Sequence, residues 1–159
     1  MNGYYFLWLI PEEPHYNKFL SVISDLSKML SGVSFLPHVT LCTSQHPDIF
    51  DISVPPVEIQ LNNICHSDHF FQSIYIDIHS DELEDLRNII AQKTQIPTKP
   101  HISLYYGDLS SSKRQNICSD LRLDIQKCRL HQKVLVFGET SQGYTSVRSW
   151  QIVKTEVLK

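Results

Sequence analysis

The sequence lacks the features that most directly assign a protein to a compartment or to a metal-binding class. Its 159 residues include four cysteines, and none of them stands at the short spacing of a zinc or redox motif. The first apolar segment has no basic residue before it and does not resemble a secretory signal. We therefore expect reduced thiols in a cytoplasmic protein.

Long apolar stretches and clusters of basic residues are also missing. The apolar run over residues 4–10 is too short to span a membrane, and it is followed by Pro11, Glu12 and Glu13. The formal net charge of −3 and the lack of a basic stripe disfavour a surface that holds a long nucleic acid. We expect a small-molecule partner, no membrane contact and a monomer.

One domain spanning residues 1–159 fits the length and the composition, because a chain of this size can bury a core without metal or disulfide support. Periodicity predicts strands over residues 4–10, 35–42, 57–65, 70–79, 100–106, 126–139 and 147–158. Helices are expected over residues 15–30 and 110–123, and from Ser80-Asp81 to a point before Pro97. A helix precedes each of the strands at 35–42 and 100–106, which suggests two pseudo-symmetric lobes.

One pentapeptide pattern occurs twice, as Pro37-His38-Val39-Thr40-Leu41 and as Pro100-His101-Ile102-Ser103-Leu104. Because side chains alternate along a strand, His38 and Thr40 share one face, and His101 and Ser103 do the same. The aliphatic residues between them face the core. If the two strands lie side by side, two imidazoles and two hydroxyls line one cleft. Such a set can deliver a proton, remove a proton and bind a phosphoryl oxygen.

The paired motifs resemble those of the 2H phosphoesterase superfamily, named for its two histidines. Three further segments are similar to the cyclic phosphodiesterases of the plant and yeast type, namely Trp8–Glu13, the Tyr106-Gly107-Asp108 ending of the second motif, and Ser149-Trp150. The resemblance implies an α+β, bilobal fold with two antiparallel sheets and flanking helices around a central cleft. It also implies that no metal and no other cofactor is needed.

The same resemblance implies an activity. Such enzymes convert nucleoside 2′,3′-cyclic phosphates to 2′-phosphates, and ADP-ribose 1″,2″-cyclic phosphate, which forms after tRNA splicing, to ADP-ribose 1″-phosphate. It assigns His101 as the base on water and His38 as the acid to the leaving oxygen, although the residues themselves leave that order open. Thr40 and Ser103 would bind the non-bridging phosphoryl oxygens.

Aromatic side chains in the cleft could stack a base or a ribose. The resemblance places Trp8 and Tyr106 there as substrate-binding residues, and Trp8 could equally be an ordinary core residue. Strict alternation instead puts Tyr105 on the face of His101. We follow the resemblance and expect Tyr106, which requires the strand to twist or to end there.

Two other functions remain open. An RNA-end processing enzyme of the same superfamily, acting as a 2′,5′-phosphodiesterase or on RNA 2′,3′-cyclic phosphates, is disfavoured by the acidic charge balance. A nucleotide- or RNA-binding module without turnover is disfavoured by the histidines of both motifs. The strands over 57–65 and 70–79 are expected to form a β-hairpin, and Cys65, His66 and His69 near its tip could supply three metal ligands, but structural zinc usually takes four. We expect a tight turn there, and we expect Cys42 to be a buried bystander.

Overall fold

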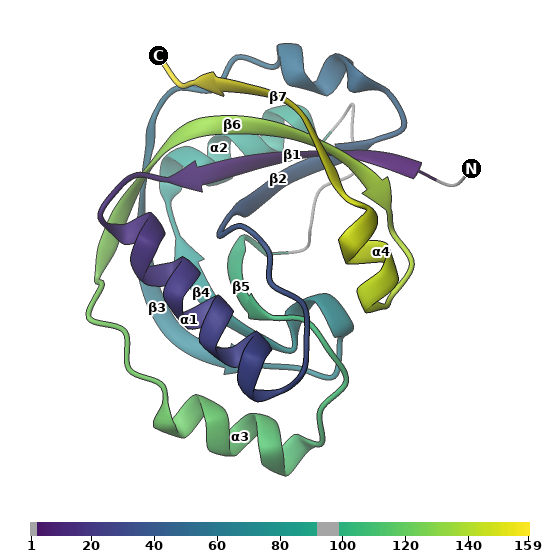
Figure 1. The fold of residues 1–159 in the computed structure, drawn as a ribbon. Helices are drawn as coiled ribbons and strands as arrows, with labels where there is room; N and C mark the ends of the chain where they lie inside the picture. Colours follow the sequence, from purple (N-terminus) through teal and green to yellow (C-terminus); the bar gives the residue numbers. More distant parts are fainter. Residues whose placement is uncertain (1–2, 92–98) are drawn as a thin grey trace.

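Seven strands of the computed structural model, which describes residues 3–91 and 99–159, form one sheet in the order β1-β2-β5-β4-β3-β6-β7. The strands are β1 (Gly3–Pro11), β2 (Val39–Ser44), β3 (Val57–His66), β4 (Ile74–His79), β5 (His101–Tyr105), β6 (Lys127–Glu139) and β7 (Gln151–Val157). Every pairing between them is antiparallel. Because β1 also pairs with β6, the sheet closes into a barrel-like ring, and β7 extends it from β6 (Figure 1).

The prediction of two separate antiparallel sheets is wrong, because backbone pairing runs continuously through all seven strands. The motif strands β2 and β5 are paired at one position, where Val39 lies opposite Ile102. This single paired position joins β1 and β2 on one side to β5 and β4 on the other. Sequence periodicity indicates which side chains face a core, but it does not reveal which strands pair across the fold.

The helices lie around this sheet, with α1 in front of its lower half and α3 at the bottom in Figure 1. They are α1 (His15–Met29), α2 (Asp81–Ile90), α3 (Ser111–Asp120) and α4 (Tyr144–Ser149), with 3-10 segments η1 (Pro47–Asp51) and η2 (Phe70–Gln72). Among the described residues, no helix has the length and apolar character that a membrane crossing needs.

Local sequence signals account for the helix boundaries. In α1 the buried side chains Phe19, Ile23 and Leu26 recur at helical spacing. Ser80 caps the start of α2, where the helix is predicted to begin. Its hydroxyl accepts a hydrogen bond of 3.2 Å from the backbone N–H of Leu83. Pro97, which was expected to follow this helix, lies outside the described residues.

Three predicted strands begin later than expected. β2 starts at Val39 and not at residue 35, because Pro37 has no N–H for a ladder hydrogen bond. The strand predicted over 70–79 is η2 followed by β4. The strand predicted over 147–158 begins as α4, in which Val147 is buried on a helical turn, and β7 follows.

The two faces of β1 separate two apolar clusters. Leu7 and Leu9 point into the main core, which also contains the buried residues of α1. Phe6 and Trp8 point to the other face, into a smaller cluster that includes Val134 of β6. The candidate site lies on this second face.

Candidate active site

A cavity of about 380 Å³ opens on the Trp8 face of the sheet. All six of the predicted site residues line it, namely Trp8, His38, Thr40, His101, Ser103 and Tyr106. The two motifs, whose histidines are 63 positions apart in the sequence, therefore contribute to one cavity, and their strands lie side by side as expected. The structure brings the whole predicted set together.

The two motif imidazoles are held in the same way. Nδ1 of His38 lies 2.6 Å from the carbonyl oxygen of Leu36, and Nδ1 of His101 lies 2.9 Å from that of Lys99. A carbonyl can only accept, so Nδ1 carries the proton in both rings. In each motif the proline separates the histidine from the accepting carbonyl. Nε2 is then the nitrogen that each neutral ring offers as a proton acceptor.

Burial favours the neutral form of both rings. The pKa of His38 is lowered from 6.5 to about 3, mainly by desolvation and to a smaller extent by His101, while the hydrogen bond to the Leu36 carbonyl opposes the shift. Desolvation also lowers the pKa of His101, against the hydrogen bond to Lys99. Both imidazoles are therefore neutral at pH 7. A ring that acts as a general acid must gain its proton together with an anionic ligand.

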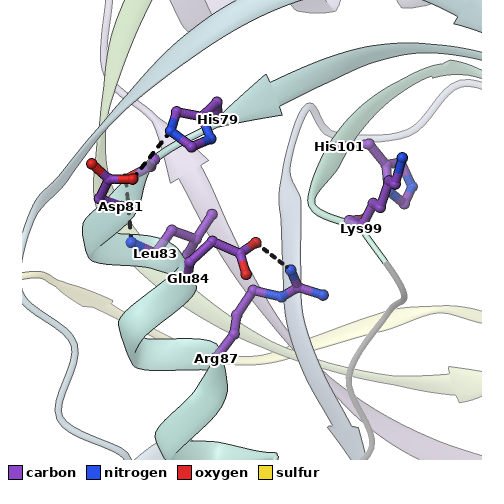
Figure 2. Close-up of polar contacts among 8 residues, drawn as sticks. His79, Asp81, Leu83, Glu84, Arg87, Lys99 and His101 are labelled. Carbon is purple, nitrogen blue, oxygen red and sulfur yellow. Dashed lines mark hydrogen bonds and ion pairs between the residues drawn. The ribbon is translucent and has the colours of Figure 1, made fainter.

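A buried cation stands beside the second motif. Arg87 of α2 is 4% exposed and pairs with Glu84 at 2.7 Å. Figure 2 shows its guanidinium group pointing from α2 toward the side on which Lys99 and His101 lie. After desolvation and the hydrogen bond, Arg87 is the next influence on the pKa of His101, which it lowers. The sequence contained a signal for this residue, because Arg87 occupies the buried stripe of α2 four positions after Leu83.

The two motif hydroxyls differ in their hydrogen bonding. Thr40 is half-buried at the wall of the cavity. Ser103 is buried, and its Oγ donates a hydrogen bond of 2.7 Å to the carbonyl oxygen of Phe71. Its proton is thus committed to the backbone of η2. To donate to a phosphoryl oxygen, the Ser103 hydroxyl must rotate away from that carbonyl.

Each motif strand contains a β-bulge at the leucine of its motif. In β2, Thr40 and Cys42 lie opposite the adjacent residues Trp8 and Leu7, so Leu41 is the additional residue. An additional residue interrupts the alternation of side chains. Thr43 therefore lines the cavity, whereas Cys42 is fully buried in the main core.

The bulge in β5 decides between the two tyrosines. Ser103 and Tyr105 lie opposite the adjacent residues Tyr75 and Ile74, so Leu104 is the additional residue. Tyr106 consequently lines the cavity. The Tyr105 hydroxyl oxygen instead lies 2.8 Å from the hydroxyl oxygen of Tyr144. The residue that strict alternation selects is therefore not the one at the cavity wall.

The predicted aromatic residues are buried against other rings of the protein. Trp8 is 4% exposed and stacks on His38, with ring centroids 3.7 Å apart. Tyr106 is 3% exposed and stacks on Phe35 at 3.8 Å. The half-buried aromatic rings at the cavity are Phe71 and Trp150, whose centroids are 5.9 Å apart.

Sequence reasoning did not assign seven other residues to the cavity, namely Phe6, Thr43, His69, Phe71, Gln72, Thr140 and Trp150. Two of them carried a signal. Trp150 was noted for its similarity to a family strand, and Phe6 alternates with Trp8 along β1. His69 was considered only as a metal ligand beside Cys65 and His66. In the structure, Nδ1 of His66 accepts a hydrogen bond of 3.3 Å from Arg114, whereas His69 lines the cavity.

Comparison with known proteins gives one sequence relative and several similar structures. No family model matches the chain. It is 22% identical over 168 residues to a protein of Arabidopsis thaliana named cyclic phosphodiesterase, with 94% of this chain and 92% of that protein covered. The fold is similar to that of E. coli LigT in complex with 3′-AMP, with a TM-score of 0.58, 12% identity and 99% of both chains covered. LigT in complex with NADP+ gives a TM-score of 0.57 at the same identity and coverage.

Proposed function

We propose that this chain, a member of the 2H phosphoesterase superfamily, is a metal-independent phosphodiesterase that opens small cyclic phosphates by hydrolysis. The observation that carries the proposal is that His38 and His101 line one cavity, each with Nδ1–H held by a carbonyl and Nε2 left to exchange protons. Two such groups are what general acid–base hydrolysis of a phosphodiester requires.

In the proposed reaction, water attacks phosphorus while a bond from phosphorus to one ring oxygen of the cyclic phosphate breaks. His101 takes the proton of the attacking water on Nε2, and His38 gives a proton from Nε2 to the departing oxygen. One proton is accepted and one is delivered, so the pair returns to its starting state after proton exchange with solvent. Arg87 helps to keep His101 neutral, which suits the base.

Hydroxyl groups would stabilise the negative charge that develops on the non-bridging oxygens. Thr40 and Ser103 both line the cavity, and the Ser103 hydroxyl can donate there once it has rotated away from the carbonyl of Phe71. Trp8 supports the site through its ring, which is stacked on His38, and Tyr106 lines the cavity with its ring stacked on Phe35. Uncharged donors bind phosphate less tightly than a guanidinium does, which favours product release.

The proposed substrates are nucleoside 2′,3′-cyclic phosphates, which would give 2′-phosphates, and ADP-ribose 1″,2″-cyclic phosphate, which would give ADP-ribose 1″-phosphate. The printed name of the Arabidopsis relative supports a cyclic phosphate substrate. The small nucleotides in the LigT complexes support a nucleotide of this size. The cavity volume of about 380 Å³ lies in the range of small-molecule sites.

Phosphorus NMR of a reaction with adenosine 2′,3′-cyclic phosphate tests this function. We expect the signal of the cyclic phosphate to be replaced by that of adenosine 2′-phosphate, at the same rate with and without EDTA. A preparation that binds the nucleotide without turnover between pH 5 and 8, or that loses activity with EDTA, would contradict the proposal.

A further inference from the structure

The connection between β3 and β4 forms a hydrogen-bonded wall of the cavity, and we name residues 67–73 the 67–73 loop. Its ends are joined by the N–H of Ser67, which donates 3.2 Å to the carbonyl oxygen of Ser73. The Ser67 hydroxyl donates to the carbonyl oxygen of Gln72 at 2.8 Å and accepts from the N–H of His69 at 3.2 Å. The predicted tight turn is thus a longer, internally bonded loop.

Two hydrogen bonds from β5 and the residues just after it hold this loop in place. Besides the bond from the Ser103 hydroxyl to Phe71, the N–H of Gly107 donates 3.0 Å to the carbonyl oxygen of Phe70. The Phe70 side chain is buried in the main core. The loop is therefore bonded to Ser103 in β5 and to Gly107 just after this strand, and His69, Phe71 and Gln72 of the loop line the cavity.

His69 has the opposite proton arrangement to the two motif histidines. The backbone N–H of Phe71 donates to Nδ1 of His69 at 3.3 Å, so this nitrogen accepts. In the neutral ring the proton must then lie on Nε2, which becomes a hydrogen-bond donor. His69 also lies within electrostatic range of His101, whose pKa it lowers. Two rings at the cavity thus offer a bare nitrogen, and the third offers an N–H.

We propose that His69 is a third histidine of the site and binds a phosphate oxygen of substrate and product through its Nε2–H. Its role is binding and not proton transfer, because its neutral ring has no bare nitrogen left for the cavity. This inference rests on the proposed function and deepens it. The ligand group is a phosphate monoester or diester, and the preformed loop holds the donor in place before the ligand arrives.

Two substitutions separate a binding role from a structural role. An asparagine side chain can place an oxygen near the position of Nδ1, whereas a glutamine side chain can place an N–H near the position of Nε2. His69→Asn therefore keeps the acceptor for the Phe71 N–H and removes the donor to the cavity. His69→Gln keeps a donor that can reach the cavity. His46→Asn serves as the matched control, since His46 is exposed and does not line the cavity.

Calorimetric binding of adenosine 2′-phosphate is measured first, because it does not depend on turnover. We expect His69→Asn to weaken binding by roughly ten-fold, the effect of losing one hydrogen bond to a charged group. We expect His69→Gln to bind more tightly than His69→Asn, and His46→Asn to match the unchanged protein. In turnover of the cyclic nucleotide, His69→Asn should raise KM with kcat within about two-fold.

Wild-type affinity in His69→Asn would overturn the inference, because it would show that His69 only caps η2. A loss of kcat with unchanged affinity would overturn it as well. A chain that binds adenosine 2′-phosphate, loses this binding in His69→Asn, and never turns over the cyclic nucleotide would refute the proposed function and leave the His69 inference supported.

Discussion

The indole ring of Trp8 lies flat on the imidazole of His38, with centroids 3.7 Å apart and an angle of 11° between the planes. The contact explains why a histidine that precedes its strand is nevertheless held in one position. Trp8 covers one face of the ring, Phe35 lies edge-on at 6.2 Å, and the Leu36 carbonyl fixes Nδ1. It also excludes water, which is the main reason for the low pKa of His38.

Replacing Trp8 should therefore change the acid–base behaviour of His38. In Trp8→Ala, water should reach the imidazole, and the His38 pKa should rise from about 3 toward 6.5. Loss of a buried tryptophan should also cost about 3–5 kcal/mol of stability. Trp8→Phe keeps a stacked ring and should keep most of the pKa shift. An NMR titration of His38 measures both variants, and an unmoved pKa in a folded Trp8→Ala protein would refute this explanation.

The low pKa of His38 should make the fold sensitive to acid. Below pH 6.5 the unfolded chain binds a proton that the folded His38 does not, so stability is lost as the pH falls from 6.5 toward 3. The group contributes a slope of up to ~1.4 kcal/mol per pH unit. Denaturant unfolding at a series of pH values should show a shallower slope in His38→Asn. The exposed His46→Asn control should keep the slope of the unchanged protein.

Removing the buried cation beside the second motif should raise the pKa of His101. Arg87→Met keeps much of the side-chain volume and removes the charge that lowers this pKa. The acidic limb of the kcat/KM profile should then move to higher pH, because the base becomes protonated more easily. Arg129→Met, at an exposed position on β6, should leave the profile in place. An unchanged acidic limb in Arg87→Met would show that Arg87 has only a packing role.

Binding of an anionic ligand should be accompanied by proton uptake. Both motif histidines have lowered pKa values, and a bound phosphate raises the pKa of a nearby imidazole. At pH 7 we expect about one proton to be taken up per bound adenosine 2′-phosphate. Calorimetry in buffers with different ionisation enthalpies counts these protons. Identical heats in all buffers would mean that the histidines do not change charge on binding.

The sequence allowed the two motif histidines to be placed in one cavity, because the alternation of side chains holds over the three residues of each motif. His38 and Thr40 reach one cavity by this rule, as do His101 and Ser103. The rule fails after the motif in each strand, because the bulges at Leu41 and Leu104 interrupt the alternation. Thr43 and Tyr106 line the cavity as a result, and Cys42 and Tyr105 do not. A leucine in a strand gives no sign that it occupies a bulge.

Other parts of the site depend on contacts between distant segments. His69 lines the cavity because the 67–73 loop is hydrogen-bonded to β5, where Ser103 lies 32 positions after Phe71 in the sequence. The stacking of Trp8 on His38 likewise requires β1 to pair with β2. Hydrophobic periodicity describes one segment at a time, so it could place each element and could not place these contacts.

The central claim is that His38 and His101 act together on one phosphorus atom, and the rates of three variants test it most directly. Asparagine can keep the hydrogen bond to each carbonyl while it removes the exchangeable nitrogen, so His38→Asn, His101→Asn and the double variant should remain folded. We predict that each single variant lowers kcat/KM for adenosine 2′,3′-cyclic phosphate by ~10²–10⁴-fold. The double variant should be little slower than the worse single variant, because the two groups act as a unit. A single variant that keeps wild-type kcat/KM would contradict the claim.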